Sequence, residues 1–446
     1  MRSLLRNVLL LTTAAVIAAP LAGAALAQDK ANVKVLMIGY PDADSMDPVT
    51  GATVPGLPNL ETAFEAANPD IDLEIISIAW GEGATAYSAK TEAMIQASES
   101  CLYEMPAAPA YGRRGMLQNL DDLITADASF ENLWGGQLDA ARSWGPENPK
   151  SLFYIPNNTG ERVIHWDTKL FEDWGVEPLS KQPTLAEIEE KAPLLTGKNP
   201  VTAEDNYGYW YQGKYAVWQF MTIAHAFGAD WGSMDEKGIL TVNWDTPEFL
   251  QALEWLVKMS KYAPAGALAT EGMPPGFLSD QNVVAIIPEG EAGYFIPPFL
   301  AQPELANRFR TSFNLKGPDG LGGLASNSPL AMAASCEDNE AGWTALKWLA
   351  GSAEASAYYF NSIGRLPTST NGTAAVPTIS ALPDGDAILG QPLTADALYP
   401  WASVQPRWSM QAAIEAAIAG TMTPAEALKQ AQTETADWLT QQTPAN

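Results

Sequence analysis

The sequence predicts an α/β protein made of two lobes, and three observations lead to that prediction. An apolar run over Val33–Ile38, a helix pattern over Leu60–Ala67 and a second apolar run over Ile71–Ile78 follow one another, which is typical of a parallel sheet. The chain has 446 residues, more than one hydrophobic core usually supports. Within Ser151–Gly175 one apolar strand pattern runs through polar residues into another, as expected where a chain passes between two packed units.

The amino-terminal segment, residues 1–27, has the pattern of a cleavable secretory signal. Arg2 and Arg6 precede an apolar run over Val8–Ala19, and small residues end the segment. The apolar run is too short to span a membrane. Since no cysteine stands at the expected cleavage site, the sequence predicts a periplasmic protein without a lipid anchor.

The composition excludes one class of partner and leaves the ligand open. The 25 basic and 52 acidic residues give a net charge of −27, and removal of Arg2 and Arg6 with the signal makes it −29. Such a chain is not expected to bind nucleic acid. The net charge says little about a ligand held by a few local groups, so the charge of the ligand stays open.

The sequence contains few residues that could bind a metal or catalyse a reaction. His165 and His225 are the only histidines, and neither has a partner at metal-ligand or catalytic-triad spacing. Nucleophile-elbow and phosphate-loop motifs are missing as well, so we expect no metal, no cofactor and no catalytic residue. Cys101 and Cys336 are the only cysteines; they either form a disulfide or remain two buried thiols, and the sequence leaves both open.

The first candidate site residues follow the first apolar run. Tyr40 and Asp42 belong to a polar loop directly after Val33–Ile38. In open α/β sheets the loops at the carboxyl ends of strands line the ligand crevice, so both residues are candidates for ligand binding. The alternative is a solvated turn. A further helix is expected over Ala86–Ser98.

The next candidates lie in the polar stretch between the two central apolar runs. A strand is expected over Leu152–Ile155, ending at Pro156, and the second strand runs from Val163 towards a helix that begins at Asp167. Between them, Asn158 and Glu161 offer hydrogen-bonding groups to a ligand. The alternative is an ordinary loop between two strands of one domain.

A run of aromatic residues supplies two more candidates. Gly208–Tyr211 is expected to form a strand, and strand alternation places Trp210 on one face and Tyr211 on the other. At least one large ring should therefore line a surface or a cleft. An amphipathic helix is expected over Phe249–Met259.

Several motifs occur in the order found in family 1 extracellular solute-binding proteins of ABC importers, and the sequence resembles that family from Val33 to Leu439. The segment 97–103 departs from it, since the family usually has Gly-x-x-Pro-Asp there. The matching segments are GRRGMLQNLDDL at 112–123, WDTKLFEDWG at 166–175, PTL at 183–185, IGRLP at 363–367 and GTMTPAEAL at 420–428.

The resemblance implies a type II periplasmic binding protein-like fold, with a ligand cleft between two lobes joined by three crossings. The first lobe would comprise residues 28–156 and 316–368, and the second lobe 157–315 and 369–446. It also implies a monomer that is not an enzyme, that binds a small molecule and that delivers it to the permease subunits of an ABC transporter.

The resemblance adds further site candidates. Glu104 would stand at a strand end that faces the cleft, and Tyr294 would follow a strand near Val283. Tyr294 is alternatively a lone exposed tyrosine, and Arg407 a surface ion pair at a helix entry. The remaining implied ligand-binding residues lie at a Pro-rich entry to the last helices: Trp401, Arg407 and Trp408.

The fifteen tryptophans favour a carbohydrate as the ligand, because indole rings stack on the apolar faces of sugars. Two alternatives stay open. One is a secreted carbohydrate-active enzyme, in which two carboxylates would flank a glycosidic bond. The other is a binding protein for a quaternary ammonium or a polyamine, with the aromatic rings as a cation cage.

Overall fold

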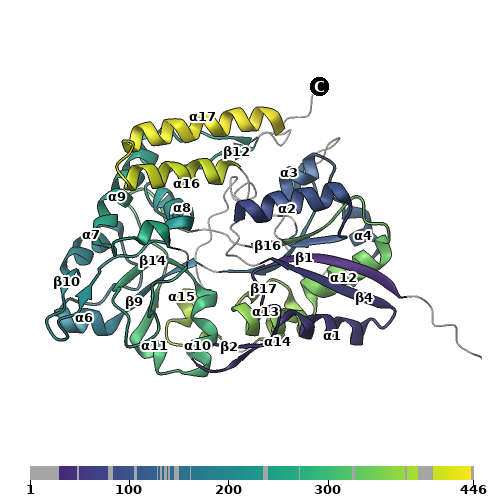
Figure 1. Ribbon diagram of the computed structural model, residues 1–446, viewed down its shortest axis with the longest axis horizontal. Coiled ribbons are helices and arrows are strands. Elements are labelled where there is room, and N and C mark those ends of the chain that lie inside the picture. Colours follow the sequence, from purple (N-terminus) through teal and green to yellow (C-terminus); the bar gives the residue numbers. More distant parts are fainter. Residues whose placement is uncertain are drawn as a thin grey trace, which may run out of the picture.

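A computed structural model describes residues 30–442 with internal gaps. The expected signal segment therefore lies outside the described residues. Figure 1 shows two lobes side by side, each with a sheet and its own covering helices. The gaps are residues 48–49, 79–83, 105–107, 128, 131–132, 135–137, 139–140, 145–149, 161, 235–239, 271, 324–326, 377–378 and 390–404.

The first lobe is built on a six-stranded mixed sheet. Its first strand pairs in parallel with the strands on both sides, as predicted, while the last strands pair antiparallel. Neighbours on both sides and helices on the faces explain why the first strand reads as a nearly continuous apolar run. The strands, in spatial order, are β17 (Leu366–Pro367), β8 (Ile155–Thr159), β16 (Asn327–Met332), β5 (Leu102–Glu104), β1 (Ala31–Ile38) and β4 (Ile71–Ile78).

Helices from two separate parts of the chain, residues 57–126 and 339–375, cover this sheet. α12 contacts strands β1, β8 and β16, and α1 packs on β4 and on α13. The helices of this lobe are α1 (Leu57–Ala67), α2 (Ala84–Ala97), α3 (Ala108–Arg113), α4 (Asp121–Ala126), α12 (Asn339–Gly351), α13 (Ala353–Ile363) and α14 (Thr370–Ala375). Two short hairpins precede β8 in the chain: β2 (Ser45–Met46) with β3 (Thr53–Val54), and β6 (Ser143–Trp144) with β7 (Lys150–Ser151).

The second lobe holds a three-stranded antiparallel sheet in the order β14 (Ile286–Glu291), β9 (Arg162–Asp167) and β15 (Phe309–Ser312). Two short hairpins accompany it: β10 (Gly197–Lys198) with β11 (Asp205–Asn206), and β12 (Ser233–Met234) with β13 (Leu240–Thr241). The helices are α6 (Thr168–Trp174), α7 (Leu185–Leu194), α8 (Ala216–Ala226), α9 (Pro247–Met259), α10 (Ile296–Ala301), α11 (Leu305–Arg308), α15 (Gly385–Leu389), α16 (Gln405–Ile418) and α17 (Pro424–Gln442).

The last two helices pack on the second lobe. α16 contacts α8 and α9, and α17 lies along α16 and α9. Figure 1 shows that α16 begins near the middle of the molecule and runs outward over this lobe. Its first turn is therefore the part of α16 nearest the first lobe.

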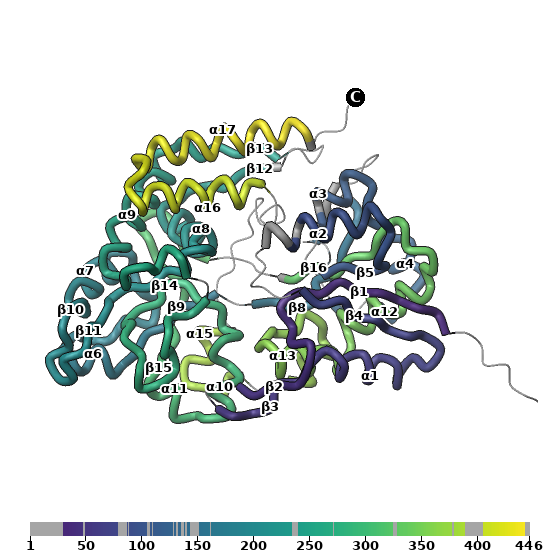
Figure 2. The backbone as a smooth tube through the Cα atoms, in the orientation of Figure 1, coloured from purple at the N-terminus to yellow at the C-terminus, as the bar shows by residue number. Residues whose placement is uncertain are grey.

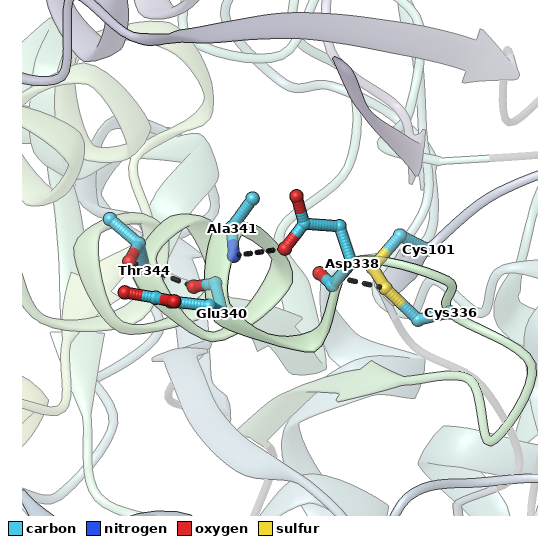
Figure 3. Close-up of a disulfide and its surroundings, with 6 residues drawn as sticks. All are labelled: Cys101, Cys336, Asp338, Glu340, Ala341 and Thr344. Atoms are coloured by element: carbon cyan, nitrogen blue, oxygen red, sulfur yellow. Dashed lines mark hydrogen bonds between the residues drawn. A yellow bond between two sulfur atoms is a disulfide. The ribbon is translucent and has the colours of Figure 1, made fainter. Parts of the chain in front are cut away.

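A disulfide joins Cys101 to Cys336, which settles the question that the sequence left open. Cys101 precedes β5, Cys336 follows β16, and the two Cα atoms are 4.6 Å apart. Close by, the Asp338 carboxylate accepts a hydrogen bond from the backbone nitrogen of Ala341 at 3.0 Å and so caps α12 (Figure 3). The bond links two chain segments 235 residues apart that pair within one sheet.

The structure corrects two local predictions. The strand expected over Leu152–Ile155 instead forms at Ile155–Thr159, because the backbone of the polar residues after Pro156 pairs with β16 and β17. Gly208–Tyr211 is not a strand, and its three aromatic rings are all buried, so the expected surface ring is wrong. This segment folds irregularly into the interior, where the Trp210 backbone nitrogen donates to the Ile286 carbonyl.

In the described part of the chain, no group of three or more His, Cys, Asp or Glu side chains is placed to hold a metal ion. None of the described helices combines the length and the apolar character that crossing a membrane requires.

Candidate functional site

The chain passes from the six-stranded to the three-stranded sheet at Gly160, between β8 and β9 (Figure 2). Arg365, just before β17 in the first lobe, forms an ion pair with Glu291 at the end of β14 in the second lobe. A Cβ atom at position 160 would overlap with the charged groups of both residues. Any larger residue at this position would have to displace one of the two charged side chains from under the crossing.

The ion pair continues into the second lobe. Arg162 on β9 donates to Glu289 at 2.7 Å and lies 3.8 Å from the carboxylate of Glu291. Burial raises the pKa of Glu289, and the neighbouring guanidinium of Arg162 opposes that shift. Glu289, Arg162, Glu291 and Arg365 thus form a buried chain of alternating charges that reaches from one lobe to the other.

A second buried cluster lies in the first lobe, at the carboxyl ends of β1 and β5. The Tyr40 hydroxyl donates to the Glu104 carboxylate at 2.8 Å, and the Ile38 backbone nitrogen lies 3.3 Å from its other oxygen. The Asn158 amide nitrogen lies 3.3 Å from the Tyr40 hydroxyl, and the Asn157 amide nitrogen lies 3.4 Å from Glu104. The structure therefore brings Tyr40, Glu104 and Asn158 together, three of the residues predicted from the sequence.

Burial shapes the protonation of this cluster. Glu104 is 1% exposed, and burial raises the pKa of its carboxyl group, while the hydrogen bonds from Tyr40 and Ile38 oppose that shift. The pKa of Tyr40 lies well above its ordinary value because the phenol is buried and the Glu104 charge is adjacent. Tyr40 therefore keeps its proton and acts as the donor of the pair.

On the second lobe, Arg407 sits in the first turn of α16 and is 4% exposed. Its guanidinium carbon lies 4.5 Å from the centre of the Trp408 ring, 4.7 Å from that of Trp218 and 5.4 Å from that of Tyr215. A guanidinium at such distances is attracted by the aromatic rings. Arg407 thus lies inside α16, not in a loop before it, and three aromatic rings pack around its guanidinium.

The other predicted residues are more dispersed. Asp42 is exposed in the turn after β1, and Tyr294, at the end of the short helix Ala292–Tyr294, is 49% exposed. Trp210 and Tyr211 are packed in the interior, where burial raises the pKa of Tyr211. Two predicted residues, Glu161 and Trp401, lie outside the described residues.

Sequence reasoning missed several residues of these clusters. The charged residues of the crossing were hidden because Gly290 and its neighbours look like a loop, whereas they end strand β14. Asn157 could have been found from the sequence, since it lies next to the predicted Asn158 in the same polar stretch. The missed residues are Asn157, Arg162, Tyr215, Trp218, Glu289, Glu291 and Arg365.

Two cavities of about 390 Å³ lie away from these clusters. One is next to the disulfide and is lined by residues such as Lys34 and Glu99. The other lies beside β9 and β15, between Trp166 and the bidentate ion pair of Arg310 with Asp384. None of the residues predicted from the sequence lines either cavity, so they are separate from the candidate site.

The sequence matches the family described as "Bacterial extracellular solute-binding protein" over residues 51–356, more than half of the chain. No curated protein sequence matches significantly.

Solved structures show the same two-lobed fold. The ABC substrate-binding protein Lmo0181 from Listeria monocytogenes, in complex with cycloalternan, is 18% identical with a TM-score of 0.71, covering 92% of this chain and 100% of that one. Maltose-bound MalE3 of T. maritima is 18% identical with a TM-score of 0.69 and the same coverage. An ABC transporter solute-binding protein from Agrobacterium vitis with bound D-mannitol is 19% identical with a TM-score of 0.65, covering 92% and 98%. The predicted two-lobed α/β fold is thereby confirmed.

Proposed function

Because the chain belongs to the family of bacterial extracellular solute-binding proteins, we propose that it captures a carbohydrate between its lobes and delivers it to the permease of an ABC transporter. The proposal concerns a binding protein and not an enzyme. Hinge opening would release the ligand.

The observation that carries the carbohydrate assignment is the cluster of Arg407 with Trp218 and Trp408 at the inner end of α16. Indole rings stack on sugar rings, and a guanidinium offers several donors in a fixed fork to neighbouring hydroxyl groups. The rings hold the guanidinium in place, so little side-chain entropy is lost on binding. The structural neighbours named with cycloalternan, maltose and D-mannitol support the same ligand class.

The same cluster argues against a quaternary ammonium or polyamine as the ligand. A cation-binding site of that kind needs an aromatic cage that the ligand enters. Here the guanidinium of Arg407 already lies between Tyr215, Trp218 and Trp408, so the protein's own cation occupies the centre of the ring cluster, where a ligand cation would bind. Trp218 and Trp408 are half-buried, and their remaining ring surface is where a sugar would stack.

We propose two lobes close to the ranges expected from the sequence, 28–156 with 316–368 and 157–315 with 369–446, except that α14 packs on α13 and β17 and so belongs to the first lobe. Since β8 continues the first sheet to Thr159, Gly160 is the better position for the first crossing. We also propose that a signal over residues 1–27 directs the mature protein, as a monomer, to the periplasm.

A thermal-shift screen tests the proposed function. The panel contains maltose, mannotriose, D-mannitol, ribitol, glycine betaine and spermidine, each at a concentration far above a micromolar dissociation constant. We expect a raised melting temperature with at least one carbohydrate or polyol and none with the two cations. A shift with a cation alone would overturn the carbohydrate assignment, and chromatographic detection of cleaved sugar would show an enzyme instead.

A further inference from the structure

Two consecutive asparagines of β8 contact the same buried cluster, which a regular strand does not allow, because successive side chains point to opposite faces. The pairing with β16 explains the exception. Ser328 pairs with Asn158 and Pro329 pairs with Pro156, so Asn157 is an extra residue in a bulge. A bulge re-aims side chains, and bulges are frequent next to functional sites. Both amide nitrogens thereby reach the pair of Tyr40 and Glu104.

The direction of every hydrogen bond in this cluster follows if Glu104 carries its charge. An ionised carboxylate can only accept, so a charged Glu104 accepts hydrogen bonds from Tyr40, from Asn157 and from the Ile38 backbone. Tyr40 has a single hydroxyl proton, and it is used on Glu104. Its oxygen can therefore only accept from the Asn158 amide, whose nitrogen lies 3.3 Å away.

This arrangement fixes which end of each amide is left over. The oxygen and the nitrogen of a side-chain amide lie on opposite sides of one planar group, so nitrogens turned toward the cluster turn the oxygens away from it. The Oδ1 atoms of Asn157 and Asn158 are buried, and no donor among the described residues reaches either of them. Both asparagines are at most 1% exposed.

Buried asparagines elsewhere in the protein differ. The Asn206 oxygen accepts from Trp174 at 3.0 Å and from the amide of Asn199, whose own oxygen accepts from the Val201 backbone at 2.8 Å. The Asn282 oxygen lies 3.3 Å from a backbone nitrogen. Asn199, Asn206 and Asn282 thus have bonded side-chain oxygens, whereas the side-chain oxygens of the two asparagines at the crossing have no bonded donor among the described residues.

We propose that Glu104 is a positioning residue that sets the hydrogen-bond polarity of the ligand site, holding Asn157 and Asn158 with their oxygens available to two hydroxyl protons of the ligand. This inference rests on the proposed function and makes it narrower. The site then selects ligand groups that donate, and replacing a contacted hydroxyl with fluorine, which cannot donate, weakens binding. The role proposed for Glu104 is to orient Tyr40 and Asn157, from which its carboxylate accepts.

Two measurements on Glu104→Gln test the inference, with Glu92→Gln as the matched control at the exposed ion pair with Arg114. The first measurement needs no ligand: nitrogen-15 spectra of the side-chain amides, assigned with Asn157→Ser and Asn158→Ser. We expect the Asn157 amide protons to move upfield in Glu104→Gln, because a charge-assisted hydrogen bond is lost, and to stay in place in Glu92→Gln. Unchanged Asn157 signals in Glu104→Gln would overturn the assigned polarity.

The second measurement is calorimetric titration with maltose and D-mannitol, followed by the monodeoxyfluoro analogues of whichever binds. In the wild-type protein at least one analogue should bind about tenfold more weakly than its parent. In Glu104→Gln the side-chain amides of Asn157 and Asn158 can turn over. The ratio of the analogue's dissociation constant to that of its parent sugar should therefore fall below about threefold. An equal ratio in both proteins would show that the amide oxygens do not contact the ligand, which overturns the inference.

The two measurements also separate this inference from the proposed function. If neither maltose nor D-mannitol nor any other member of the panel binds, the proposed function fails, and the amide spectra still decide the polarity of the cluster. If Glu104→Gln does not fold, the titrations of the wild-type protein with the monodeoxyfluoro analogues test the inference without the variant. A wild-type affinity that no monodeoxyfluoro analogue lowers more than about twofold would contradict the inference.

Discussion

Arg365 and Glu291 form an ion pair across the boundary between the two lobes, directly under the glycine that carries the chain from one lobe to the other. The pair is not isolated, because Glu291 also faces Arg162, which in turn binds Glu289. A buried charge is tolerated only with such partners. Arg365 with Glu291 is thus the contact that joins the two lobes, and Arg162 and Glu289 extend it within the second lobe.

The first prediction concerns this pair. Glu291→Gln removes the charge that compensates Arg365 and should lower the free energy of unfolding by about 3 kcal/mol, as expected for a broken buried ion pair. Asp205→Asn is the matched control, since its pair with Lys198 has side chains 70% and 60% exposed and should be worth less than about 1 kcal/mol. Urea denaturation measures both, and equal losses would contradict a special role for the crossing.

The second prediction concerns a close backbone approach between the lobes. Gly364 ends α13 with a φ of +68°, and a Cβ atom there would overlap with the backbone of Gly293 in the second lobe. Gly175 ends α6 with a φ of +63° and has no atom within 4 Å of such a Cβ. Both glycines therefore avoid the same left-handed strain, and only Gly364 also faces a neighbour.

Thermal melts of Gly364→Ala and Gly175→Ala separate these effects. Gly175→Ala should cost about 1 kcal/mol, the left-handed strain alone. Gly364→Ala should cost at least about twice as much, because the added methyl group also forces the two lobes apart. Similar melting temperatures for the two variants would show that the approach between Gly364 and Gly293 is easily relaxed.

The third prediction concerns the disulfide. The double variant Cys101→Ser with Cys336→Ser should lose about 2 to 5 kcal/mol of unfolding free energy, because the bond closes a loop that contains most of the second lobe. Dithiothreitol should lower the melting temperature of the wild-type protein and leave the double variant unchanged. If the reductant affects both proteins alike, it does not act through this bond.

The fourth prediction concerns Arg407. Arg407→Lys keeps the charge and loses the planar fork and its stacking on Trp218 and Trp408, so affinity for the best carbohydrate of the screen should fall about tenfold or more. Arg114→Lys, at the partly exposed pair with Glu92, should bind like the wild-type protein. If calorimetry shows that Arg407→Lys binds the carbohydrate with unchanged affinity, Arg407 is not part of the site. Trp218 and Trp408 are then the next candidates.

The fold could be predicted from the sequence because its strong signals are local. The two apolar runs form β1 and β4, which pair in parallel as predicted. Capped helices such as α9 begin and end close to the predicted residues. The aromatic run at Trp210 was assigned wrongly because strand alternation was assumed for a segment that follows an irregular path into the core.

The site was predicted only in part, because its partners meet by tertiary folding. Tyr40, Glu104 and Asn158 stood at strand ends, where position in the sheet predicts proximity. The pairing of Arg365 with Glu291 joins residues 74 positions apart in the sequence on two different lobes, and no local pattern announces it. The bulge at Asn157 likewise depends on the register with β16, which the sequence of β8 alone does not specify.

Ligand-induced closure is the central claim, and small-angle X-ray scattering tests it most directly. The radius of gyration is measured with and without a saturating amount of the carbohydrate that gives the largest thermal shift. A ligand that bridges the lobes favours the closed form, so the radius should decrease, and Arg407→Lys should need more carbohydrate to reach the same decrease. A carbohydrate that binds by calorimetry and leaves the radius of gyration unchanged would contradict capture between two hinged lobes.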